Sequence, residues 1–152
     1  MEGPLEQQLS PRQVAARRAQ ATGRMANTLA KALAKRFGGR WQFVDFHGPK
    51  GYESAGIVDI VAIRKCGKPP EVPGLKKLDL FDIKLIQVKG GSAPLPGPED
   101  IARLRAVKAY YRATEVVLFE WVGGKRSAFS VLEDKLDKWT ETQGAHLFGA
   151  KS

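Results

Sequence analysis

The chain has 152 residues, 43% of them hydrophobic and 27% charged, with a formal net charge of +9, and this composition is typical of one globular domain. No stretch approaches the roughly 18 consecutive apolar residues of a membrane span, and the first residues lack the basic-then-apolar order of a secretion signal. The single cysteine, Cys66, excludes a disulfide scaffold and a thiolate metal site, so any metal would need oxygen ligands. We therefore expect one cytoplasmic domain without a membrane partner, with flexible tails at residues 1–10 and 141–152.

The first predicted element is a long helix over residues 11–37. This segment is rich in Ala, Arg, Lys, Gln and Leu, and Met25, Leu29, Leu33 and Phe37 recur at four-residue spacing. A Gly-Gly pair at 38–39 is expected to end the helix.

Most of the positive charge falls on this helix and the residues directly after it. Residues 10–50 contain nine basic residues and one acidic residue, a net charge of +8, whereas the rest of the chain is nearly neutral. Such a block indicates a polyanion partner, because each neutralised phosphate releases counterions and adds affinity. The alternative is a solvated helix face, which usually carries both signs of charge. The candidate nucleic-acid ligands are Arg12, Arg17, Arg18, Arg24, Lys31, Arg36, Arg40 and Lys50.

The remaining elements are predicted from hydrophobic patterning between Pro- and Gly-rich breaks. They are strands at 41–46, 57–63 and 79–89, a helix at 99–112, strands at 114–122 and 127–132, and a polar helix at 133–140. The order αβββαββ predicts an α/β fold in which a crossover helix joins strands of a mixed sheet.

Polar residues within the second and third predicted strands form the strongest candidate site. Gln87 and Lys89 share one face of a strand by its period of two, and Asp59 lies in an aliphatic stretch. A carboxylate in such a strand needs a metal or a cation as partner. If the two strands are neighbours, the three residues form a cluster able to hold a divalent ion and a phosphate. An ordinary salt bridge between Asp59 and Lys89 is an equally good interpretation of the spacing.

A wider set of motifs resembles the PD-(D/E)XK nucleases and, within them, the archaeal-type Holliday junction resolvases, with Gln in the QxK variant of the motif. The resemblance covers about residues 21–132. Its residues are Gly23 to Asn27, Ser54-Ala55-Gly56, Val58 to Ala62, Gln87-Val88-Lys89, the helix from Asp100 to Arg112, and Glu115 to Glu120.

The resemblance implies a restriction-endonuclease-like core and an endodeoxyribonuclease that requires Mg²⁺ (or Mn²⁺), acts on branched DNA in recombination or repair, and works as a homodimer. Asp59 would be its metal-binding aspartate, Lys89 the motif lysine, and Ser54 a serine of the substrate-facing loop. Asn27 and Gln87 replace carboxylates of the family, and together they lower the negative charge of the site. Mrr-like restriction enzymes also carry Gln in the QxK form.

The metal ligands that follow from this reading are oxygens. Asp59, the Gln87 side-chain oxygen, the Val88 carbonyl and waters would surround Mg²⁺, and Lys89 would orient or deprotonate the attacking water. Glu53 is the better candidate for a compensating carboxylate, because Asp82 has the wrong strand parity. Two other functions are open: a DNA-binding module on the same fold with weakened or lost cleavage, and a restriction-like duplex nuclease.

Overall fold

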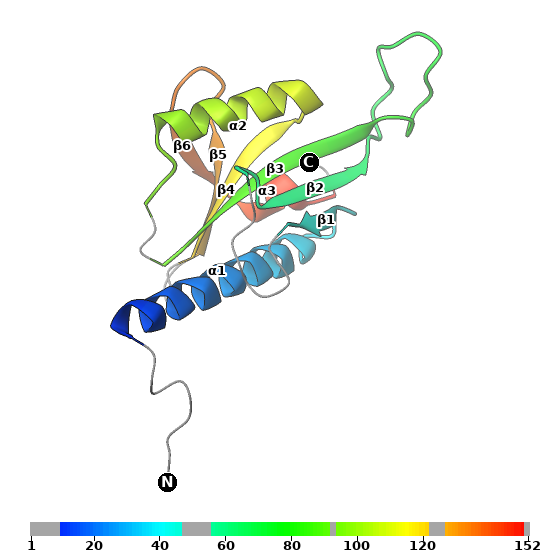
Figure 1. The fold of residues 1–152 in the computed structure, drawn as a ribbon. Helices are drawn as coiled ribbons and strands as arrows, with labels where there is room; N and C mark the ends of the chain where they lie inside the picture. Colours follow the sequence, from blue (N-terminus) through cyan, green and yellow to red (C-terminus); the bar gives the residue numbers. More distant parts are fainter. Residues whose placement is uncertain (1–9, 47–55, 92–93, 122–126, 151–152) are drawn as a thin grey trace.

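The computed structural model describes residues 10–46, 56–91, 94–121 and 127–150, and for residues 15–25 it describes the backbone alone. Its described strands form one open sheet in the order β1-β2-β3-β4-β5-β6, with helices packed against it (Figure 1). The predicted α/β class and mixed sheet are confirmed, and a further strand and a short helix follow the predicted order αβββαββ. In chain order the elements are α1 (Pro11–Lys35), β1 (Gln42–Asp45), β2 (Ile60–Lys65), β3 (Phe81–Gly90), α2 (Pro98–Tyr111), β4 (Glu115–Trp121), β5 (Ser127–Leu132), β6 (Trp139–Thr142) and α3 (Gly144–Phe148).

The sheet is antiparallel except for the pair β3 and β4, which run parallel. Parallel neighbours need a crossover connection, and α2 supplies it. Side chains of α1 and α3 pack with one set of strand residues, whereas α2 packs with the other set, so the two long helices lie on opposite faces of the sheet (Figure 1).

Helix α1 begins with a capping box. The Ser10 hydroxyl accepts the Gln13 amide at 3.2 Å, while the Gln13 side chain accepts the Ser10 amide at 2.9 Å. Toward its other end, Ala26, Ala30 and Ala34 are the fully buried apolar residues at four-residue spacing. Their small side chains let the helix axis approach the sheet closely, and Leu29 and Leu33 of the predicted stripe are partly buried beside them.

The two faces of β3 follow its alternating side chains. Ile86 and Val88 pack in the core cluster that includes α1, whereas Ile83 and Leu85 pack in the cluster that includes α2. The pairing of β3 with β4 is continuous from Lys84 to Gly90. Gln87 and Lys89 have the same parity as Ile83 and Leu85 in this uninterrupted strand, so they lie on the same face of the sheet as α2.

The C-terminal segment differs from the prediction. Residues 133–140 do not form a polar helix, because residues from Trp139 onward pair with β5 as strand β6. Residues 141–150 are not a flexible tail, since Leu147 and Phe148 of α3 are buried in the core. Strand pairing uses backbone groups, so a polar sequence can form an edge strand whatever its side chains. Residues 1–9 and 151–152 lie outside the described residues.

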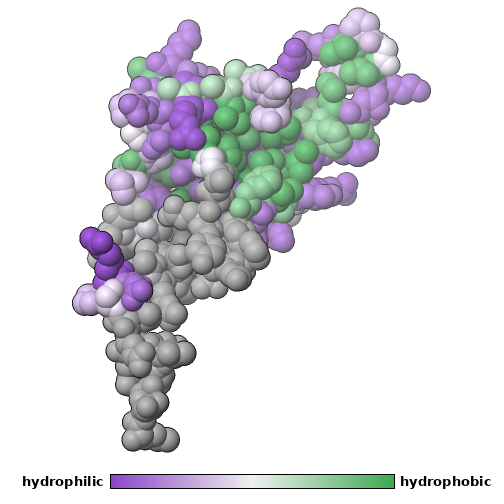
Figure 2. Space-filling view, viewed as in Figure 1, coloured by the Kyte–Doolittle hydropathy of each residue, from purple (hydrophilic) through white to green (hydrophobic). Residues whose placement is uncertain are grey.

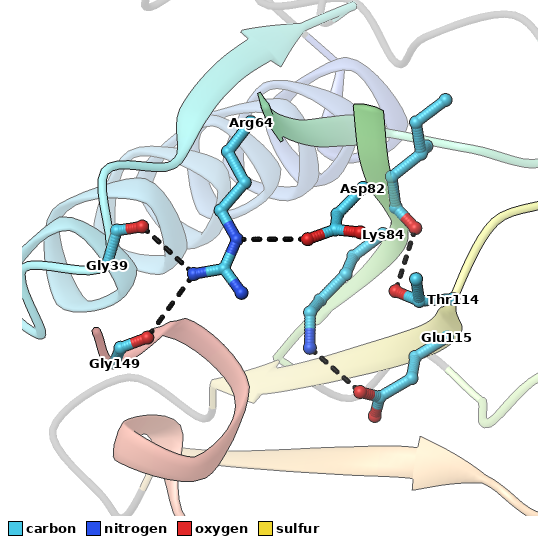
Figure 3. A network of polar contacts seen from close by, with 8 residues as sticks. Gly39, Arg64, Asp82, Lys84, Thr114, Glu115 and Gly149 are labelled. Atoms are coloured by element: carbon cyan, nitrogen blue, oxygen red, sulfur yellow. Dashed lines mark hydrogen bonds and ion pairs between the residues drawn. The ribbon is translucent and has the colours of Figure 1, made fainter. Parts of the chain in front are cut away.

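Arg64 connects α3 and the α1–β1 turn to the sheet, and Lys84 connects β3 to β4 (Figure 3). Arg64 of β2 donates from Nη1 to the carbonyls of Gly39 (3.0 Å) and Gly149 (3.4 Å), and its Nε lies 3.3 Å from Asp82 Oδ2. Lys84 of β3 is only 3% exposed, and its Nζ lies 2.8 Å from Glu115 Oε1. Both cations are therefore used by the fold. No helix in the described part of the chain is long and apolar enough to cross a membrane.

Candidate functional site

Polar side chains of four neighbouring strands gather at one end of the sheet. Because β1 and β2 are antiparallel, as are β2 and β3, the end of β1 and the start of β2 lie toward the end of β3. The parallel strand β4 ends there as well. The residues at this end are Asp45, Asp59, Gln87, Lys89 and Glu120. The structure thus brings Asp59 to the end of β3 that carries the QxK motif, as the sequence predicts for neighbouring strands.

Asp59 is held against β3 by its backbone and by its side chain. Its amide donates to the Ile86 carbonyl at 3.0 Å, and its Oδ2 accepts the Val88 amide at 2.8 Å. The carboxylate therefore contacts β3 at the residue between Gln87 and Lys89. It takes a ladder hydrogen bond that a backbone carbonyl would otherwise accept, which explains why β2 begins at Ile60 and not at residue 57 as predicted.

The Gln87 side-chain oxygen is buried and has no hydrogen-bond partner among the described residues. Gln87 pairs with Leu118 of β4, whose side chain is fully buried and apolar. A buried carbonyl oxygen without a partner costs roughly 1–3 kcal/mol, and most such atoms in proteins are satisfied. An unpaired oxygen at this position is therefore an available ligand for a cation.

Lys89 lies beside Glu120, its partner in the parallel register of β3 and β4. The Lys89 Nζ is 3.9 Å from Glu120 Oε2, and the two side chains are 15% and 35% exposed. The lysine is thus mostly enclosed but anchored by a more accessible carboxylate. No sequence motif singles out Glu120, because only the parallel register places it opposite Lys89.

Asn27 belongs to a second polar group, formed with the neighbouring strand β1. It is 3% exposed, and its Nδ2 donates to Asp45 Oδ1 at 3.0 Å. The Lys31 Nζ lies 2.9 Å from the other oxygen of Asp45. A glutamate at position 27 would place a second carboxylate beside Asp45, so the amide at 27 suits the carboxylate on β1. Asp45 pairs with Ile60, next to Asp59, but no sequence motif placed it near the candidate site.

The predicted nucleic-acid ligands are only partly described. Arg12, Arg36 and Arg40 are exposed, whereas Lys31 forms the ion pair with Asp45. Arg17, Arg18 and Arg24 lie on α1, but their side chains are outside the described residues, as is Lys50. Asn27 contacts Asp45, the last residue of β1, and therefore lies level with the end of the sheet that carries the site. The N-terminal half of α1, which precedes Asn27, extends beyond this end (Figure 1). Ser54 and Glu53 also lie outside the described residues.

The donor atoms at this end of the sheet are oxygens, the type of ligand that a hard divalent cation binds. The Asp59 carboxylate and the unpaired Gln87 oxygen are oxygen ligands, as Mg²⁺ prefers. Within the described ranges, no three His, Cys, Asp or Glu residues form a group that could hold a metal. A metal held here would therefore keep several waters, which Mg²⁺ commonly does.

Comparison of the chain with protein-family models, with curated proteins and with solved structures finds no match.

Proposed function

We propose that this protein is a metal-dependent DNA endonuclease of the PD-(D/E)XK type that is selective for branched DNA and acts as a two-fold dimer. The proposal rests above all on the buried, unpartnered Oε1 of Gln87, which lies next to the residue that holds the Asp59 carboxylate. A structural role alone would leave this oxygen uncompensated, whereas a bound cation would satisfy it.

Each residue at the end of β3 has a part in this proposal. Asp59 and Gln87 would hold Mg²⁺ or Mn²⁺, which when bound polarises a phosphoryl oxygen and acidifies a water. The Val88 amide holds the Asp59 carboxylate in place through its 2.8 Å hydrogen bond. Lys89 orients the attacking water and balances the charge that develops on the phosphoryl group. Glu120 limits the positions of the Lys89 ammonium group.

The DNA part of the proposal is supported by charge. The N-terminal half of α1, which contains Arg12, Arg17, Arg18 and Arg24, extends beyond the sheet at the end that carries the site. A duplex bound along this helix would pass close to Asp59 and Lys89. Symmetric cleavage of two strands at a junction requires two such sites related by a two-fold axis.

A second candidate is a DNA-binding module on the same fold that has lost cleavage. Two observations favour it: the described residues contain no group of three metal-ligating side chains, and Lys89 already has Glu120 as an ionic partner. In this case Asp59 and Lys89 would only stabilise the ends of β2 and β3.

One cleavage experiment separates the two candidates. Purified protein is incubated with a labelled four-way junction and with a linear duplex of the same sequence, with and without Mg²⁺ or Mn²⁺. The Asp59→Asn variant should bind the junction but not cut it. Asp82→Asn is the matched control, because it removes a carboxylate that pairs with Arg64 near the opposite end of β3.

Metal-dependent cleavage that disappears in Asp59→Asn and persists in Asp82→Asn supports the nuclease. Junction binding without cleavage by the wild type, under every metal condition, supports the binding module. Cleavage by Asp59→Asn at the wild-type rate would contradict the assignment of Asp59.

A further inference from the structure

The connection between β2 and β3 is a projecting arm, defined here as residues 65–81 and visible at the upper right of Figure 1. Backbone hydrogen bonds order it: the Cys66 amide donates to the Leu80 carbonyl at 2.8 Å, and the Leu78 amide donates to the Cys66 carbonyl at 3.2 Å. Within the tip, the Lys76 amide donates to Asp79 Oδ2 at 2.7 Å. The arm is therefore ordered by its own hydrogen bonds and is not merely a long loop.

Large apolar side chains are concentrated on this arm and exposed to solvent. Of the twelve exposed large apolar residues in the described part of the chain, five lie between residues 72 and 81. They are Val72, Leu75, Leu78, Leu80 and Phe81. Figure 2 shows hydrophobic residues gathered at the upper right, where the arm projects. Scattered exposed leucines need no explanation, but such a concentration marks an interaction site.

Leu78 adds a second indication that the side chains themselves matter. Its backbone has φ of 76°, in the left-handed region that glycine or asparagine adopts most easily, and its side chain is 50% exposed. A glycine here would relieve the backbone without loss of core packing. A leucine at this position is therefore best explained by a contact that its side chain makes with a partner.

The charge of the arm indicates which partner. Lys65, Lys68, Lys76 and Lys77 are exposed, and none forms an ion pair with a carboxylate among the described residues. With two acidic residues, the arm carries a net charge of +2. Residues 10–50 carry a net charge of +8, and the whole chain carries +9. All residues outside residues 10–50 and the arm therefore have a combined net charge of −1. The arm thus carries a net positive charge outside residues 10–50, which suits a polyanionic partner.

We propose that the arm binds DNA, with its lysines on phosphates and its apolar side chains inserted against a base step that it kinks from the minor groove. Apolar wedges flanked by basic residues act in this way in DNA-bending proteins. A second copy of the chain fits less well, because two such arms would bring eight lysines together. The inference rests on the proposed binding of DNA, but not on cleavage.

The length of β3 sets the separation of this contact from the candidate site. Phe81 and Lys89 lie at opposite ends of the strand, eight residues apart, which at roughly 3.3 Å per residue is about 26 Å. At 3.4 Å per base pair, this distance corresponds to about eight base pairs. A duplex in contact with both the arm and the site must therefore extend at least that far from the cleaved bond.

The test compares the full-length Leu75→Ser/Leu78→Ser variant with the wild type on a labelled 30-base-pair duplex. Binding is measured by fluorescence anisotropy, bending by energy transfer between the duplex ends, and base unstacking by 2-aminopurine placed at successive positions. Both leucines are exposed, so the melting temperature of the variant should equal that of the wild type. Leu136→Ser is the matched control, because Leu136 is 61% exposed in the β5–β6 connection.

We expect the double variant to bind the duplex at least tenfold more weakly, and to lose both bending and 2-aminopurine unstacking, while Leu136→Ser behaves as the wild type. Equal binding and bending by the double variant would overturn the inference. So would a wild-type dimer that the double variant converts to monomer with unchanged DNA bending, or arm-dependent binding to anionic lipid vesicles without DNA bending. Arm-dependent bending by a wild type that cuts no DNA would support the arm and refute only the nuclease proposal.

Discussion

Replacing Gln87 by methionine tests the central feature of the candidate site. Methionine has a similar volume and no oxygen, so Gln87→Met removes the buried Oε1, which has no hydrogen-bond partner in the described part of the chain. Leaving such an oxygen unsatisfied costs about 1–3 kcal/mol, so the variant should be more stable than the wild type by about this amount. For a domain of this size, each kcal/mol raises the melting temperature by roughly 2–4 °C. We expect an increase of roughly 2–12 °C in the presence of EDTA.

The same variant should lose the response to metal. A ligand at 100 times its dissociation constant stabilises a protein by about 2.7 kcal/mol, so Mg²⁺ should raise the melting temperature of the wild type. The Gln87→Met protein lacks one of the two proposed side-chain ligands, and its melting temperature should remain flat over the same titration. It should also cleave no DNA. Gln42→Met is the matched control, because Gln42 is an exposed glutamine of β1.

Two results would refute this reasoning. If Gln87→Met is no more stable than the wild type in EDTA, the oxygen is not an uncompensated buried group. If Mg²⁺ stabilises both proteins equally, Gln87 is not a metal ligand. Calorimetry with EDTA and with increasing Mg²⁺ measures both quantities on the same samples.

Three further predictions use other contacts of the structure. Lys89→Ala should bind junctions normally but cleave them slower by orders of magnitude, and normal single-turnover cleavage would contradict its role. Glu115→Ala should lower the free energy of unfolding by about 2 kcal/mol, because it leaves the Lys84 ammonium buried without its carboxylate. Lys84→Met removes the buried charge itself and should change this free energy by less than about 1 kcal/mol. Urea unfolding measures both changes. Arg17→Glu/Arg18→Glu should weaken binding to all DNA sequences alike and make the dependence of log affinity on log salt shallower by about two phosphate contacts, whereas a loss confined to one sequence would exclude phosphate contacts.

Local patterns in the sequence were sufficient to predict most of the secondary structure. The composition and the four-residue apolar spacing of the first segment predict a helix ended by a Gly-Gly pair, and α1 occupies Pro11–Lys35. Strands β3, β4 and β5 also lie within about two residues of the predicted ranges. These elements are encoded by their own residues, through helical composition, apolar periodicity and runs of β-branched and aromatic side chains. The C-terminal strand and helix were missed because β6 is polar and depends on pairing with β5.

The residues of the candidate site were likewise only partly predictable from the sequence. The period of two within β3 placed Gln87 and Lys89 on one face, and the cost of a carboxylate among aliphatic residues singled out Asp59. Two further carboxylates at this end of the sheet could not be found in this way. Glu120 lies opposite Lys89 only because β4 is parallel to β3, and Asp45 meets Asn27 only because α1 crosses the end of β1. Strand order, direction and helix placement follow from burial of the whole core, so no short segment encodes them.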